Sequence, residues 1–112
     1  MKLDFSRPPG LSAVGKEAYE IIVRFLKDND LTRGEGRVFY SPKEWQDRKE
    51  DYGTNSELIV TYGGGSPVAK AFSYDAFDYV TREAMKTELS KARLHSEDAT
   101  GWYGYIVDLN RG

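Results

Sequence analysis

Two stretches of the chain repeat their apolar residues every three or four positions, which is the spacing of a helix with one buried face. The first stretch follows Ser12, a residue that can cap a helix, and predicts a helix over about residues 13–29. The second follows Asp75, which can also cap, and predicts a helix that runs to about Ala92. These are the two long helices of the predicted fold.

Residues 41–44 have the composition of a third helix start. Ser41 can cap, the proline after it suits the first helical position because its missing N–H would be unpaired there anyway, and Glu44 can complete a capping box. We expect this shorter helix to run to about Tyr52, with Gly53 as its left-handed terminator. Trp45 is expected to hold it on the surface of the domain.

Four segments have the β-branched and aromatic content typical of strands. The strongest is 57–62, which is apolar on both faces over 58–60 and is therefore predicted to be a central strand. A short strand is predicted at 37–40, and a hairpin is predicted from 94–98 and 102–109.

Residues 68–72 fit either a short return strand or an extended connection, and we favour the connection. The predicted order of elements indicates an α+β domain. Its mainly antiparallel sheet has about four strands, with two long helices and one short helix packed on it. Residues 1–112 form this single domain, and residues 1–10, which contain two adjacent prolines and a glycine, are expected to be an irregular arm.

Composition narrows the classes of function. No apolar run of the 112 residues approaches the ~20 needed to span a bilayer, and the N-terminus lacks the apolar core of a signal peptide, so we expect a cytoplasmic protein without membrane contact. The chain has no cysteine and one histidine, His95. Thiol nucleophiles, iron–sulfur clusters and zinc sites are therefore not expected, and no metal or cofactor is predicted.

A glycine loop, Gly63, Gly64 and Gly65, follows the predicted central strand, where phosphate-binding loops also lie. Such loops need a lysine and a hydroxyl opening a helix, or a Gly-x-Gly-x-x-Gly spacing directly before one. Here Ser66 and a proline follow, and the next predicted helix opens only at Asp75. We therefore interpret the loop as a turn that needs positive φ angles, with a ligand or partner contact as the alternative.

His95, Glu97 and Asp98 form a cluster with acid–base chemistry. Side chains alternate along a strand, so His95 and Glu97 are expected on one face and Asp98 on the other. Because the sequence places no nucleophile beside this pair in a recognisable arrangement, an exposed histidine is favoured over a catalytic one.

Aromatic residues make up 13% of the chain, which is more than we expect the core to hide. Tyrosine and tryptophan combine apolar area with a polar group and are common in binding surfaces. For most of these aromatics we favour half-exposed rings packed across strands, with a binding surface as the alternative. A binding surface is predicted near the glycine loop, and its candidate residues are Tyr62, Gly63, Gly64, Gly65, Tyr74, Asp75, Trp102 and Tyr103.

Residues 39–45, 63–64 with 72–75, and 101–103 together resemble a group of small proteins found in bacterial mobile elements. The shared features are a Ser-Pro-x-Glu-Trp helix start, a glycine loop and a Trp-Tyr pair. The chain departs from this pattern at Ser73, where asparagine is common, so no role of a side-chain amide carries over. The group has no established activity. The resemblance implies an accessory protein in which Tyr74, Asp75, Trp102 and Tyr103 contribute to function.

We hold three hypotheses of function. The first is a non-enzymatic protein-interaction or binding module, acting on a host protein if it is a mobile-element accessory protein. The second is a small-molecule-binding protein or enzyme that uses His95 and Glu97. The third is a weak nucleic-acid binder, although the net charge is -2 and nucleic-acid binders usually carry a basic stripe. Its basic face would consist of Arg24, Arg33, Arg37, Arg48 and Lys49.

Overall fold

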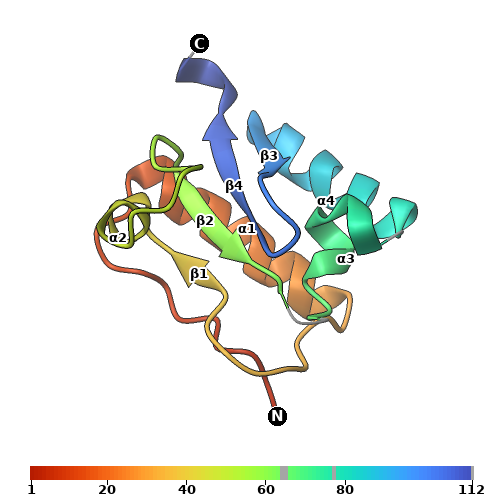
Figure 1. The fold of residues 1–112 in the computed structure, drawn as a ribbon. Helices are drawn as coiled ribbons and strands as arrows, with labels where there is room; N and C mark the ends of the chain where they lie inside the picture. The colour runs from red at the N-terminus through yellow and green to blue at the C-terminus, as the bar shows by residue number, and fades with distance from the viewer. Residues whose placement is uncertain (64–65, 77, 112) are drawn as a thin grey trace.

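Four antiparallel strands form the sheet of the computed structural model, which describes residues 1–63, 66–76 and 78–111 (Figure 1). The strands lie in the order β1-β2-β4-β3, so the last hairpin of the chain places β4 beside β2. This arrangement confirms the predicted α+β class. The strands are β1 (Phe39–Tyr40), β2 (Leu58–Thr61), β3 (Leu94–Asp98) and β4 (Tyr103–Asp108).

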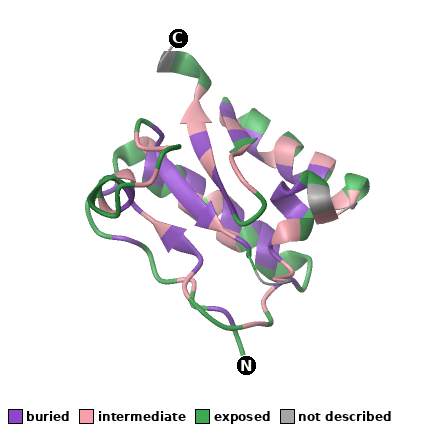
Figure 2. Ribbon diagram, viewed as in Figure 1, coloured by how far each residue is buried: buried purple, intermediate pink, exposed green. Residues whose placement is uncertain are grey.

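Strand β2 has the central place predicted from its apolar run. It pairs with β1 through Phe39 and Val60 and with β4 through Leu58 and Ile106. Figure 2 shows its residues as buried along nearly the whole strand. Leu58 and Val60 pack in the main core, whereas Ile59 packs on the opposite face of the sheet, as side-chain alternation requires.

The two long helices cover one face of the sheet. α1 (Ala13–Asp28) crosses behind it in Figure 1, and α4 (Tyr79–Lys91) lies beside β3. Ser12 caps α1 as predicted, because its Oγ accepts from the Gly15 N–H at 3.0 Å. Together these helices and the sheet enclose a core that includes Ala18, Ile22, Leu26, Leu58, Val60, Met85, Leu89 and Ile106. Among the described residues, no helix is both long and apolar enough to cross a membrane.

The short helix α2 (Pro42–Asp47) lies on the other face, where Trp45 packs with Ile59 and Tyr103 in a second, smaller core. The predicted extension of this helix to Tyr52 was wrong. The helix ends at Asp47 with Arg48 as its C-cap, and Lys49 has a φ of +61°. Gly53 does have a positive φ, but its role is close packing, since a Cβ there would lie 2.9 Å from Ile59 Cδ1.

Residues 68–72 are neither the strand nor the extended connection considered above. They contain a one-turn helix, α3 (Ala69–Phe72), whose last residues are buried, and a 3-10 turn at Tyr74–Ala76 follows. The start of the second long helix was also predicted too early. Asp78 caps α4 by accepting from the Thr81 N–H at 3.1 Å, so Asp75 is not the cap.

The N-terminal arm is irregular, as predicted, but it is packed against the domain. Its backbone makes isolated bridges at Lys2 and Asp4 with the segment before β1, and the Leu3 side chain is buried. The arm therefore extends the main core past the edge of the sheet.

Candidate binding surface

The structure separates the predicted binding residues by exposure. Tyr62 and Tyr103 are buried, whereas Gly63, Tyr74 and Trp102 are exposed. Gly64, Gly65 and the side chain of Asp75 lie outside the described residues. A partner could therefore touch the three exposed residues directly, and the two buried tyrosines could act only by supporting them.

The end of β2 and the turn between β3 and β4 meet as the sequence suggested. The Tyr62 N–H donates to the Trp102 carbonyl at 2.8 Å, and a Cβ on Gly63 would lie 3.0 Å from Trp102 Cβ. Asp98 joins these elements to the turn after α3: one oxygen accepts from the Tyr62 hydroxyl and the other from the Tyr74 N–H at 3.2 Å. Sequence reasoning did not identify Asp98 as this link, because only the fold brings its two donors together.

The exposed rings of Trp102 and Tyr74 nevertheless belong to different clusters. The Trp102 ring lies against Trp45 and Tyr103, with centroids 5.6 and 4.6 Å away. The Tyr74 ring lies against the guanidinium of Arg82 on α4, at 4.2 Å. The predicted aromatic surface is thus divided into two chemically different parts.

The first part is a row of contacting aromatic rings with two guanidinium groups packed on it, which we call the aromatic–arginine surface. Its members are Arg37, Tyr40, Trp45, Arg48 and Trp102. The Arg37 guanidinium lies 4.1 Å from the Tyr40 ring centroid, Tyr40 lies 5.0 Å from Trp45, and the Arg48 guanidinium lies 4.6 Å from Trp45. Trp45 is fully buried, and Trp102 beside it is 39% exposed. Tyr40 and Trp45 were missed as site residues, because the sequence cannot show that α2 folds back onto the strand turn.

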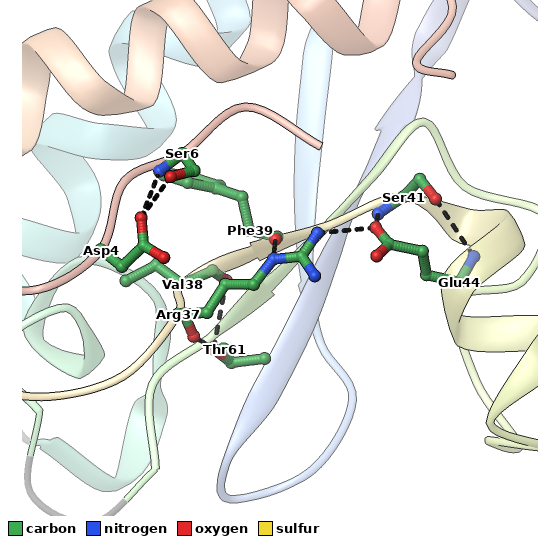
Figure 3. A network of polar contacts seen from close by, with 8 residues as sticks. All are labelled: Asp4, Ser6, Arg37, Val38, Phe39, Ser41, Glu44 and Thr61. Atoms are coloured by element: carbon green, nitrogen blue, oxygen red, sulfur yellow. Dashed lines mark hydrogen bonds and ion pairs between the residues drawn. The ribbon is translucent and has the colours of Figure 1, made fainter. Parts of the chain in front are cut away.

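A capping box fixes α2 and Arg37 together (Figure 3). Ser41 Oγ accepts from the Glu44 N–H at 3.1 Å, and Glu44 Oε1 accepts from the Ser41 N–H at 2.9 Å and from Arg37 Nη2 at 2.7 Å. Arg37 Nε also donates to the Phe39 carbonyl at 2.8 Å. The guanidinium is therefore held over Tyr40 by two fixed acceptors.

The electrostatics of Glu44 reflect these bonds. Burial raises the pKa of its carboxyl, but the hydrogen bonds from Arg37 and Ser41, with the charge of Arg37, outweigh burial and hold the pKa below its ordinary value. Glu44 is thus an anion that orients Arg37 at neutral pH.

Trp45 carries an unusual feature. Its indole Nε1 is buried and has no hydrogen-bond partner in the part of the chain that the structure describes. A buried indole N–H normally finds a partner. This ring therefore supports its neighbours through ring contacts and the Arg48 guanidinium, without a hydrogen bond of its indole N–H.

His95 and Glu97 share one face of β3, as predicted. His95 Nε2 lies 3.0 Å from Glu97 Oε1, and their side chains are 40% and 50% exposed. Tyr105 pairs with Glu97 across the strands, and burial, followed by the charge of Glu97, raises the pKa of its hydroxyl. Among the described residues, no group of three His, Asp or Glu side chains could hold a metal ion.

The basic residues of the nucleic-acid hypothesis do not gather on one face. Arg24 belongs to α1, behind the sheet, whereas Arg37 and Arg48 lie on the side of α2. Arg37 pairs with Glu44, and Arg48 Nε lies 3.7 Å from Glu50. The positive charges of both arginines in the aromatic–arginine surface are therefore partly balanced by nearby carboxylates.

Comparison of the chain with known protein families, curated proteins and solved structures found no match. The resemblance to mobile-element proteins stays a prediction, and the function has to be argued from the geometry.

Proposed function

We propose that this protein is a non-enzymatic binding module that recognises another protein through the aromatic–arginine surface, with Trp102 as the anchor. The observation that carries the proposal is the support beneath Trp102. Its ring is partly exposed to solvent and rests on the fully buried ring of Trp45. Tryptophan, tyrosine and arginine are the residues that most often dominate binding energy at protein interfaces.

The surface is held in place before any partner arrives. Trp45 contacts Tyr40, Tyr103 and Trp102, and the capping box fixes Arg37 over Tyr40. Side chains that are already ordered lose little conformational entropy on binding. This rigidity favours binding of a matching surface over a role in catalysis.

The arginines bring polar specificity to the edge of the surface. Arg37 uses Nε and Nη2 in bonds within the protein, and a guanidinium has five N–H donors in all. Further donors can therefore reach carbonyl or carboxylate groups of a partner. We infer an apolar segment flanked by such acceptors as the partner surface.

A single-stranded nucleic acid could also stack on exposed aromatics beside arginines. The net charge of -2 and the carboxylates paired with Arg37 and Arg48 favour a protein partner instead. That the partner is a host protein rests only on the resemblance to mobile-element proteins.

A capture experiment with matched variants tests the proposal. Immobilised wild type, Trp102→Ala, Arg48→Ala and Tyr79→Ala are exposed to bacterial lysate, and the bound proteins are quantified by mass spectrometry. Tyr79 is an exposed aromatic on α4, away from α2, and serves as the control. We expect a protein enriched by wild type and Tyr79→Ala and lost from Trp102→Ala and Arg48→Ala. Failure to enrich any protein, or equal capture by Trp102→Ala, would contradict the proposal.

A further inference from the structure

A second cluster surrounds Arg82. It includes Tyr74, whose N–H donates to Asp98, and is distinct from the aromatic–arginine surface. The Arg82 guanidinium lies 4.2 Å from the Tyr74 ring centroid and 5.7 Å from that of Tyr79. Lys86, one turn further along α4, donates to the Tyr74 hydroxyl at 3.1 Å. We call Tyr74, Tyr79, Arg82 and Lys86 the cationic–tyrosine cluster.

Arg82 is buried and forms no ion pair with any carboxylate whose side chain the structure describes. The residue is only 8% exposed, and its buried Nε has no hydrogen-bond partner. Its Nη1 lies 3.5 Å from the Ser73 carbonyl, which is a long contact. Among the carboxylates whose side chains the structure describes, which leave out Asp75, none lies within 4.0 Å of this guanidinium. Hydrogen bonds from Thr81 lower the pKa of the Asp78 carboxyl, and Asp78 is near enough for the charge of Arg82 to contribute, but it forms no ion pair with Arg82.

Such an arrangement is unfavourable for the isolated chain. A guanidinium stays protonated in proteins, so Arg82 cannot avoid the penalty of burial by losing its charge. The rings of Tyr74 and Tyr79 offset part of this penalty through cation–π attraction. An anion that accepted from the guanidinium would offset more, because hydrogen bonds between charged groups are stronger.

We propose that the cationic–tyrosine cluster is a binding site for a phosphate-class oxyanion, either inorganic phosphate or a phosphate group on a small molecule. Arg82 supplies a planar set of donors that matches phosphate oxygens, and Lys86 supplies a second positive charge. The site is separate from the aromatic–arginine surface, so the two proposals can fail independently.

Tyr74 is the residue that must move for the anion to enter. Its ring covers the guanidinium, yet it is 55% exposed, and its hydroxyl is held by Lys86 alone among the described contacts. When the ring swings outward, both cations become available together. Tyr74 therefore acts as a cover that the anion displaces.

Two acidic neighbours limit what the site accepts. Asp98 accepts from the Tyr74 N–H, and Asp78 accepts from the Thr81 N–H at the start of α4. Their charges oppose a large polyanion more than a single compact group. We therefore expect inorganic phosphate to bind better than nucleic acid.

The test is a titration of the protein with inorganic phosphate, in which binding is monitored through amide chemical shifts in two-dimensional NMR spectra. Sodium chloride at matched ionic strength is the salt control, and acetate tests whether any carboxylate suffices. Saturable shifts are expected around Tyr74, Arg82 and Lys86 with phosphate. No saturable shift up to tens of millimolar phosphate, or tighter binding of acetate than of phosphate, would overturn the proposal.

Variants connect any binding to the named residues. Arg82→Met is expected to abolish the shifts, Lys86→Gln to weaken binding at least several-fold, and Lys91→Gln, on the same helix but paired with Glu88, to leave it unchanged. Equal binding by Lys86→Gln and wild type would overturn the proposed role of the second cation. Lys86 is only partly buried and Lys91 is exposed, so this comparison stays valid if Arg82→Met folds poorly.

Thermal unfolding separates a ligand-binding arginine from a structural one. Phosphate should raise the melting temperature of wild type, since a ligand that binds only the folded state stabilises it, and should leave that of Arg82→Met unchanged. In phosphate-free buffer the two proteins should melt at similar temperatures, because the arginine has no anion there. A much lower melting temperature of Arg82→Met in that buffer would show a satisfied structural arginine and overturn the proposal.

Discussion

Trp102 lies against Trp45, with ring centroids 5.6 Å apart, so that a turn between strands and the short helix α2 share one aromatic layer. One ring of the pair is exposed and the other is fully buried. The exposed ring therefore has a fixed support, which is the geometry of an interface anchor.

The two tryptophans are the only ones in the chain, so their fluorescence reports the pair directly. Trp102→Phe leaves the buried Trp45, and Trp45→Phe leaves the exposed Trp102. We expect Trp45 alone to emit at shorter wavelength and to resist acrylamide quenching, and Trp102 alone to be quenched several-fold more strongly. Equal quenching of the two variants would show that the burial described here is wrong.

Truncation of Trp45 should remove the centre of the second core. Trp45→Ala is expected to lower the free energy of unfolding by about 3–5 kcal/mol. Trp45→Phe should cost clearly less, because it keeps much of the packing and removes an indole N–H that has no partner. Urea unfolding of the three proteins measures both effects, and equal losses in the two variants would contradict this assignment.

The capping box makes stability depend on pH through Glu44. The pKa of this carboxyl in the folded protein lies below its ordinary value of 4.5, so its contribution to stability is present above that pH and is lost as the pH falls through the folded value. Glu44→Gln should lower the free energy of unfolding at pH 7 by about 1 kcal/mol. The gap from wild type should narrow between about pH 5 and pH 3 in urea unfolding. A gap that stays constant over this range would contradict the prediction.

Gly104 allows β4 to lie between its two neighbours. A Cβ at this position would lie 2.4 Å from the Glu97 carbonyl oxygen and 2.9 Å from the Tyr62 hydroxyl. Gly104→Ala should therefore lower the free energy of unfolding by roughly 1–3 kcal/mol, measured in urea. Adding Tyr62→Phe removes only the clash with the side chain, so the double variant should regain little of the lost stability. Full recovery of the free energy of unfolding would place the strain on Tyr62 instead of the Glu97 backbone.

Periodicity and capping residues predicted most of the fold. In three elements a local preference agrees with the burial found in the structure. These are the apolar face of α1, the Ser41 capping box of α2 and the apolar strand β2. The predicted elements were wrong where two local signals compete or where the element is too short to show a pattern. Residues 69–72 form one helical turn that is too short for a periodic pattern, and either Asp75 or Asp78 could have capped the next helix.

The candidate surface was predictable only in part. Trp102 was identified from its turn and its aromatic ring, and the structure leaves that ring exposed. Its support by Trp45 and the link through Asp98 depend on contacts between segments far apart in the chain. No spacing in the sequence encodes such contacts, and the separation of Tyr74 from Trp102 was hidden for the same reason.

Photo-crosslinking from position 102 tests the central proposal most directly. A photoreactive phenylalanine derivative replaces Trp102 in one protein and Tyr79 in another, and both are illuminated in bacterial lysate at equal concentration. The proposed function predicts a discrete protein adduct from position 102 that is absent from position 79 and is competed away by excess wild type but not by excess Trp102→Ala. Identical adduct patterns from the two positions, or no competable adduct from position 102, would contradict it.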